Sequence, residues 1–245
     1  MAGHSKWKNI KHAKAATDAK RGAVFTKLIR EITVAAKAGG GDPGGNPRLR
    51  TAIDAARAQS MPKENIDRAV KKGTGELEGV EYVEITYEAY GPGGVALMIQ
   101  ALTDNPTRTV ADVRAKLTRN GGNLGTSNSV SFMFERKGRI YLPAAGDEDA
   151  MMEVALDAGA SDFGREDDIF AVTTEPTELH AVKESLEAKG LKISEAKLEW
   201  MPQSTVHVTG EDARTLVKLL DVLEDLDDVQ NVEGNFDIDE SALDD

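Results

Sequence analysis

The sequence contains no cysteine among its 245 residues. Disulfide bonds, thiolate metal sites and cysteine nucleophiles are therefore excluded, and a chain without disulfides is typical of a reducing compartment. Aromatic residues make up only 5% of the chain, so its cores must be mainly aliphatic. No apolar run approaches the ~20 residues that a membrane-spanning helix needs, and the first residues lack the apolar core of a secretory signal. We therefore expect a cytoplasmic protein that does not contact a membrane.

Positive charge is scarce overall but concentrated at one end. The whole chain has a net charge of −12, yet residues 1–72 hold 16 Lys and Arg against 6 Asp and Glu. Residues 73–245 hold only 14 Lys and Arg against 36 Asp and Glu. A basic end of this kind is typical of contact with nucleic acid, and an acidic remainder would confine that contact to one face.

The first 75 residues have the apolar spacing of helices. Val24, Leu28 and Ile32 belong to a face that recurs every three or four residues. Asn46 followed by Pro47 predicts a capped start for a second helix, whereas Pro62 and Gly73 predict the two ends of a third. Three short amphipathic helices predict a compact bundle with a basic exterior.

The remaining residues combine strands with helices. Alternating or continuous apolar residues predict strands, and an Asn–Pro pair at 105–106 opens a helix. Within 138–202 the predicted order is β-α-β-β-α-β, the ferredoxin-like pattern. The other predicted strands lie at 81–90, 95–102, 130–135, 205–209 and 229–235, with a last helix at 211–223.

These elements predict a multidomain protein of α and α+β class. The N-terminal three-helix bundle would be followed by an α+β domain, with a ferredoxin-like α+β domain inserted in it. The expected limits are 1–75 for the bundle with its N-terminal arm, 76–136 plus 204–238 for the middle domain, 137–203 for the insertion and 239–245 for an acidic tail.

Several long segments together resemble the YebC family. They include MAGHSKWKNIKHAK, NPRLRTAIDAAR, MPKENIDRAVKKGTGE, YEAYGPGGVALM and NGGNLGTSNSVSFMFERKG, in this order. The similarity runs over nearly the whole chain and is densest in residues 1–137. It implies the three-domain arrangement given above and a DNA-binding role in transcription. Mitochondrial relatives imply translational activation instead, and bacterial members imply a ribosomal role in translating proline-rich stretches. The resemblance implies no catalytic residues.

The strongest candidate contacts lie near the N-terminus. Lysines spaced two to three residues apart would follow a phosphate backbone, and Trp7 would either stack on an unpaired base or pack on the bundle. The expected nucleic-acid-binding residues are Lys6, Trp7, Lys8, Lys11, His12, Lys14, Lys20, Arg21, Lys27 and Arg30.

Secondary contacts are expected on the later helices and on a polar loop. The loop at 121–129 carries backbone and hydroxyl donors that suit phosphate or a ribose, although a simple hairpin connection is the alternative. The possible secondary contacts are Arg48, Arg50, Arg57, Arg114, Arg119 and Asn123.

Other functional sites find little support in the sequence. The four histidines lack metal-ligand spacing, and neither a catalytic motif nor a cofactor motif is present, so we expect no metal, no cofactor and no enzymatic activity. An acidic cluster lacks the order of a calcium-binding loop and is predicted to be a solvated helix end. It consists of Asp221, Glu224, Asp225, Asp227 and Asp228.

The leading hypothesis is therefore a non-enzymatic, nucleic-acid-binding regulator of gene expression that binds DNA and acts in transcription. One alternative is a ribosome-associated translation factor that binds RNA. A second alternative is a protein-interaction scaffold that binds no nucleic acid. In the first two cases the acidic domains would be free to contact a protein partner.

Overall fold

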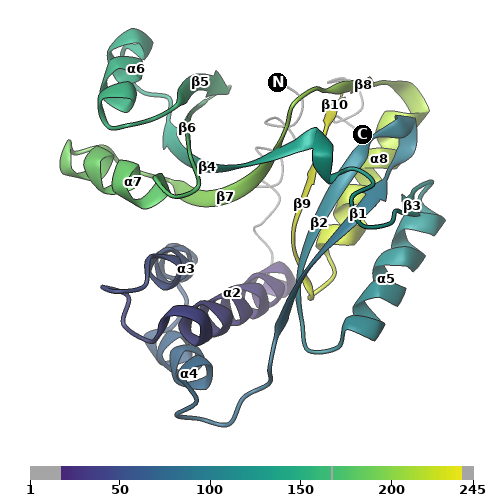
Figure 1. Cartoon of the computed structure of the whole chain (residues 1–245), viewed down its shortest axis with the longest axis horizontal. Helices are drawn as coiled ribbons and strands as arrows, with labels where there is room; N and C mark the ends of the chain where they lie inside the picture. The colour runs from purple at the N-terminus through teal and green to yellow at the C-terminus, as the bar shows by residue number, and fades with distance from the viewer. Residues whose placement is uncertain (1–17, 167, 239–245) are drawn as a thin grey trace.

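The computed structural model describes residues 18–166 and 168–238, with helices and strands in the order expected for the fold class (Figure 1). Three helices come first: α2 (Asp18–Gly39), α3 (Pro47–Ala58) and α4 (Lys63–Thr74). The predicted start of α3 is confirmed, because the Asn46 side chain accepts a hydrogen bond from the Leu49 amide at 3.1 Å. Ile32, Leu49 and Ile66 bring the three helices together around one small aliphatic core.

The prediction that Gly73 ends the third helix is wrong. Helix α4 continues to Thr74, and Gly75 adopts the left-handed conformation that ends it (φ 83°). Gly73 serves helix packing instead, since a Cβ there would lie 2.4 Å from the Thr33 carbonyl oxygen. The missing side chain lets α4 approach α2 closely.

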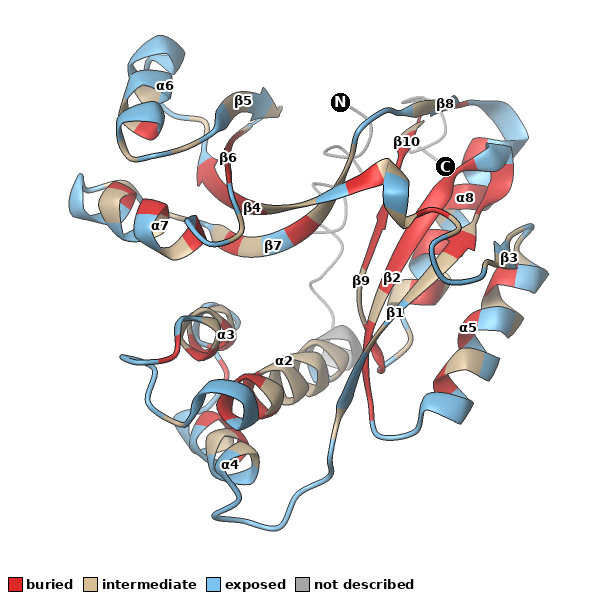
Figure 2. Cartoon of the chain, viewed as in Figure 1, coloured by how far each residue is buried: buried red, intermediate tan, exposed pale blue. Residues whose placement is uncertain are grey.

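The middle of the molecule is an antiparallel sheet with the order β3-β1-β2-β9. Its strands are β1 (Val83–Tyr90), β2 (Ala96–Thr103), β3 (Asn123–Leu124) and β9 (Val229–Gly234). Helices α5 (Pro106–Arg119) and α8 (Gly210–Glu224) cover one face of this sheet. Strand β2 is central and almost wholly buried, as its continuous apolar sequence predicts (Figure 2). A short turn η1 (Pro92–Gly94) links β1 to β2, and β8 (Val206–Val208) pairs in parallel with β10 (Phe236–Ile238).

A second four-stranded sheet has the order β5-β6-β4-β7. Its elements are β4 (Phe134–Pro143), α6 (Glu148–Asp157), β5 (Asp162–Glu166), β6 (Ile169–Thr174), α7 (Leu179–Ala188) and β7 (Glu195–Pro202). Their succession along the chain is β-α-β-β-α-β, which confirms the ferredoxin-like prediction. Ile140, Phe170 and Leu186 lie in the core between this sheet and its two helices.

The separate strand predicted at 130–135 does not form. Residues Ser131–Met133 make a short 3₁₀ turn, η2, and β4 then runs without a break from Phe134 into the second sheet. Val130 and Phe134 pack with Ala96 and Met98, on the face of the middle sheet that α5 and α8 leave open. The segment therefore crosses that face instead of adding a strand to the edge.

Within 18–166 and 168–238, no helix combines the length and apolar character that a bilayer crossing requires.

Candidate nucleic-acid interface

The arm expected to bind nucleic acid lies outside the described residues. Lys6, Trp7, Lys8, Lys11, His12 and Lys14 all belong to it. Lys20 and Arg21 fall in the first turn of α2, but the structure describes the side chains only from residue 22 onward. These eight positions therefore stay predictions.

Lys27 and Arg30, further along α2, point into the protein. The Lys27 ammonium donates to the Glu224 carbonyl oxygen at 2.5 Å, and Arg30 donates to the carbonyl oxygens of Leu102 and Asp227 at 3.1 and 2.7 Å. The Arg30 guanidinium also forms an ion pair with Asp228 at 2.5 Å, and its side chain is only 12% exposed. Arg30 therefore fastens the helical bundle to the middle sheet.

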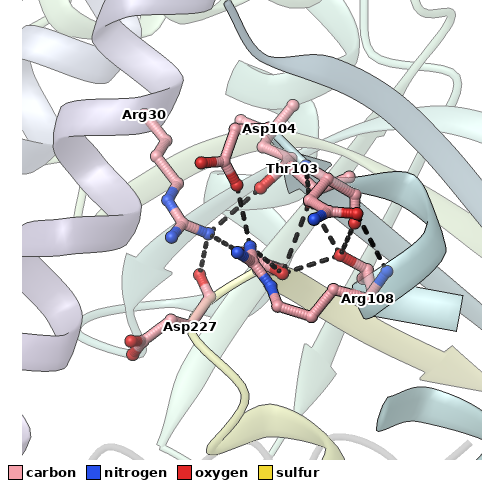
Figure 3. A network of polar contacts seen from close by, with 9 residues as sticks. Arg30, Thr103, Asp104, Arg108 and Asp227 are labelled. Atoms are coloured by element: carbon pink, nitrogen blue, oxygen red, sulfur yellow. Dashed lines mark hydrogen bonds and ion pairs between the residues drawn. The ribbon is translucent and has the colours of Figure 1, made fainter. Parts of the chain in front are cut away.

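Asp228 is the centre of this network, because Arg30 and Arg108 both donate to its carboxylate. Figure 3 shows the network with Arg30, Thr103 and Arg108 labelled. The Asp228 carboxylate accepts hydrogen bonds from Thr109 at 2.7 Å and from Arg108 at 2.9 Å. Burial opposes ionisation of this carboxyl, but the bonds from Thr109, Arg108 and Arg30 outweigh that effect and hold its pKa below the ordinary 3.8.

The expectation that the whole acidic cluster is solvated is therefore wrong for Asp228, which is 7% exposed. Sequence reasoning missed it because its two arginine partners come from α2 and α5. The nearest signal in the sequence was the excess of Asp and Glu at this helix end.

The arginines of α3 are also neutralised by acidic neighbours. Arg48 forms ion pairs with Glu31 at 2.7 Å and with Glu84 of β1. Arg50 pairs with Glu184 of α7 at 2.9 Å, and Arg57 lies 3.6 Å from Asp54. Asp54 in turn contacts Lys183 of α7 at 3.1 Å. Arg48 therefore joins the bundle to the middle sheet, and Arg50 joins it to the ferredoxin-like part. Asp54 adds a further contact between α3 and α7.

Helix α4 is different, because its cations face solvent. The side chains of Lys63, Arg68, Lys71 and Lys72 are exposed, and none has an ion-pair or hydrogen-bond partner among the described residues. Three cations, Arg57, Lys63 and Lys71, also line a pocket of about 430 Å³ between α3 and α4, together with Asp67 and Glu76. The contacts expected from the sequence include no cation of α4, although the adjacent Lys71 and Lys72 were the available signal.

Two of the expected secondary contacts are likewise unpaired. Arg114 and Arg119 on α5 are exposed, and neither pairs with another described residue. Asn123 is exposed on β3, where its backbone pairs with Tyr90. These three residues and the polar loop at 121–129 belong to one continuous segment of the chain. The elements that carry them, α5 and β3, lie apart from the helical bundle (Figure 1).

Metal ligands do not gather in the described part of the chain, where no group of three His, Asp or Glu side chains could hold an ion. His180 is half-buried near Arg50 and Lys183. Its burial, and to a lesser extent the two positive charges, lower its pKa.

Comparison with known proteins assigns the chain to a family. Residues 5–76 match the model of the TACO1/YebC protein N-terminal domain, and residues 82–236 match that of the TACO1/YebC second and third domain. The chain belongs to the TACO1/YebC family.

Curated TACO1/YebC relatives are similar over their full length. A "probable transcriptional regulatory protein" of Gemmatimonas aurantiaca is 66% identical over 244 residues, covering 99% of each chain. One of the same description from Acidithiobacillus ferrooxidans is 54% identical, covering 99% of this chain and 97% of its own. The crystal structure of a conserved hypothetical protein from Aquifex aeolicus has a TM-score of 0.86 at 51% identity and covers 93% of this chain and 94% of its own.

Proposed function

We propose that this protein is a regulator of gene expression that binds DNA through phosphate contacts made by helix α4 and the N-terminal arm. The observation that carries the proposal is the contrast between helices. Arg48 and Arg50 of α3, together with Lys27 and Arg30 of α2, contact other parts of the molecule, whereas the four cations of α4 are exposed and have no partner among the described residues. An exposed cluster of this kind attracts polyanions. The description of the relatives as probable transcriptional regulatory proteins supports the same role.

Phosphate contact, more than base recognition, fits the residues of α4. Its exposed charged side chains are four cations and the acids Glu64 and Asp67. Lysine meets phosphate as a point charge, whereas bidentate recognition of guanine uses arginine, and α4 offers only Arg68 for it. We therefore expect binding that depends steeply on salt and weakly on sequence.

The test is duplex-DNA affinity by fluorescence anisotropy across a salt series, with the full chain. Lys71→Glu/Lys72→Glu should weaken binding and make the slope of log affinity against log salt shallower by about 1 to 2, since each lost phosphate contact contributes about 0.9. Lys189→Glu/Lys192→Glu makes the same charge change on exposed residues of the ferredoxin-like part and is the matched control. Equal losses in both variants would mean that only net charge matters and would refute the assignment to α4.

The arm is tested separately. Replacing Lys6, Lys8, Lys11 and Lys14 together with alanine should also lower the affinity and the salt slope. Trp7→Phe keeps an aromatic surface and Trp7→Ala removes it, so only the second should weaken binding if this side chain stacks on a base. Unchanged affinity in the lysine variant would remove the arm from the proposed interface.

A ribosome-associated, RNA-binding translation factor is the second candidate. The observation in its favour is that unpaired cations occur on two separate helices, α4 and α5, since folded RNA is recognised largely by its shape and phosphates. Co-sedimentation with ribosomes, measured beside the DNA titration at physiological salt, distinguishes the two. Ribosome binding that survives where DNA binding is lost would favour the RNA role, and loss of both would favour a protein-interaction scaffold.

A further inference from the structure

The contact between helices α3 and α7 is made by two ion pairs of opposite direction. Arg50 of α3 pairs with Glu184 of α7 at 2.9 Å, and Lys183 of α7 pairs with Asp54 of α3 at 3.1 Å. Each helix thus offers one cation and one acid to the other. Figure 1 shows α3 at the side of the bundle nearest α7. The ferredoxin-like part is therefore held to the bundle at this point by charge.

The bundle shares no buried apolar cluster with the rest of the described chain. The cluster that contains Leu49 and Ile53 of α3 draws its members only from the bundle. Strand β7 also lies next to α3, but none of its residues joins this cluster. In contrast, Trp200 of β7 packs with Met98 and Phe134, so the ferredoxin-like part and the middle sheet do share apolar contacts. The bundle is therefore the part that can move with the smallest loss of apolar burial.

The bundle is attached at two places that differ in exposure. The Arg30–Asp228 pair is buried, whereas the side chains of Arg50 and Glu184 are 34% and 59% exposed. Exposed ion pairs are weak and are screened by salt. The chain passes from α4 to β1 through residues 75–81, which are exposed and form neither helix nor strand. Such a connection can absorb a rotation, so α3 can leave α7 while α2 stays attached.

Arg50 is the cation that such a separation would release. In the described part of the chain its only ion-pair partner lies on α7. Lys183 would keep Glu187 of its own helix, 3.5 Å away, and Asp54 would keep Arg57 at 3.6 Å. The separation therefore changes the availability of one guanidinium and leaves the other cations of this contact paired.

We propose that Arg50 is a latent phosphate contact, which Glu184 occupies until a nucleic acid displaces this carboxylate. Carboxylate and phosphate compete for a guanidinium because both accept its forked pair of hydrogen bonds. Arg50 lies in the first turn of α3, where there is no acidic residue and the helix dipole favours an anion. Arg48 is not part of the latent contact, since it keeps Glu31 within the bundle. The assignment rests on the proposed function, because it adds a regulated contact for the same ligand.

The first experiment measures duplex-DNA affinity by fluorescence anisotropy with the full chain. Lys183→Gln/Glu184→Gln removes both ion pairs and leaves the net charge unchanged. It should raise the affinity about fivefold at about 0.15 M salt and steepen the salt slope by about 0.9, the effect of one added phosphate contact. The matched control is Glu211→Gln/Lys218→Gln, the same neutral change on exposed residues of α8, which should leave the affinity unchanged.

A third substitution tests whether the gain belongs to Arg50. Adding Arg50→Gln to the Lys183→Gln/Glu184→Gln variant should remove the gain in affinity. Adding Arg214→Gln instead removes an exposed arginine of α8 and should keep most of the gain. Equal losses from the two additions would mean that net charge alone matters and would refute the role of Arg50.

The second experiment measures the separation of the two helices by energy transfer. The chain has no cysteine, so dyes can be attached through Gln59→Cys after α3 and Ala188→Cys on α7, both exposed. Duplex DNA should lower the transfer in the otherwise wild-type chain, and Lys183→Gln/Glu184→Gln should lower it without DNA. Constant transfer on DNA binding would refute the displacement.

The outcomes separate this inference from the proposed function. If the wild type binds DNA and Lys183→Gln/Glu184→Gln binds it equally well, only the latent contact is refuted. If the variant binds DNA and the wild type does not, the latent contact is supported in its strongest form. If neither binds, the latent contact and the proposed function both fail.

Discussion

Replacing Asp228 with asparagine tests whether the bundle is fastened to the middle sheet by a buried charge. The substitution keeps the size of the side chain and removes the negative charge that Arg30 and Arg108 share. Arg30 cannot turn to solvent without leaving the carbonyl oxygens of Leu102 and Asp227. Its charge would therefore stay largely buried without a counterion.

The expected loss of stability follows from the exposure of the partners. The side chains of Arg30 and Asp228 are 12% and 10% exposed, so their pair belongs to the buried class, where removing one partner costs about 3–5 kcal/mol. Arg108 is 46% exposed, so solvent screens its share of the interaction. Because Arg30 keeps its bonds to two carbonyl oxygens, we expect the lower end, about 3 kcal/mol, or a fall in melting temperature of about 6–12 °C for a chain of this size.

Urea and thermal unfolding monitored by circular dichroism measure this loss for wild type and Asp228→Asn. The double variant Arg30→Met/Asp228→Asn completes the cycle, and a coupling of more than about 1 kcal/mol is expected from groups in direct contact. A loss of less than about 1 kcal/mol in Asp228→Asn, the value of an exposed ion pair, would refute the reasoning.

Acid pH offers an independent check on the same group. The folded protein holds the Asp228 pKa below its ordinary 3.8, so this carboxylate stabilises the fold fully above that pH. Its contribution is lost as pH falls through the lower pKa of the folded state. The stability difference between wild type and Asp228→Asn should therefore be constant from neutral pH to about 4.5 and shrink below 3.8.

Three further outcomes are expected. Gly73→Ala should destabilise by about 1–3 kcal/mol in urea unfolding, because its Cβ would meet the Thr33 carbonyl oxygen, whereas Gly22→Ala on α2 has free space and should stabilise slightly. Arg30→Met should lower stability but leave nucleic-acid affinity within about twofold in the folded protein. If Arg30→Met instead weakened nucleic-acid binding as much as Lys71→Met does, Arg30 would be a phosphate contact after all. The Glu88 carboxylate accepts hydrogen bonds from the amides of Asn128, Val130 and Ser131, so Glu88→Gln should speed amide hydrogen exchange over residues 128–131, and unchanged exchange would contradict a role of Glu88 in ordering this loop.

The local signals in the sequence predicted most elements correctly. The Asn–Pro pairs at 46–47 and 105–106 start helices because the asparagine side chain accepts an early amide and proline suits the first turn. The β-α-β-β-α-β order and the central position of β2 followed from apolar periodicity alone. The limits proposed for the domains stay predictions, and β4 runs without interruption across the limit placed between residues 136 and 137.

The errors arose where a residue's role depends on a distant partner. Gly73 has the spacing of a helix end, yet its absent side chain is needed by α2, which approaches from the other side. Residues 130–135 have the composition of a strand, yet the open face of the middle sheet buries two of them. Neither neighbour is visible in a window of local sequence.

By itself the sequence determined the family, the fold class and the concentration of positive charge in residues 1–72, because caps, periodicity and charge counts are properties of short segments. Which of those charges remain available to a ligand was decided only by the tertiary structure. Arg30 and Asp228 are 198 residues apart and meet only when α2 packs beside the last strand of the middle sheet. Folding thereby pairs Arg48 and Arg50 of α3 and Arg30 of α2 with acidic side chains. It leaves the cations of α4, and Arg114 and Arg119 of α5, exposed.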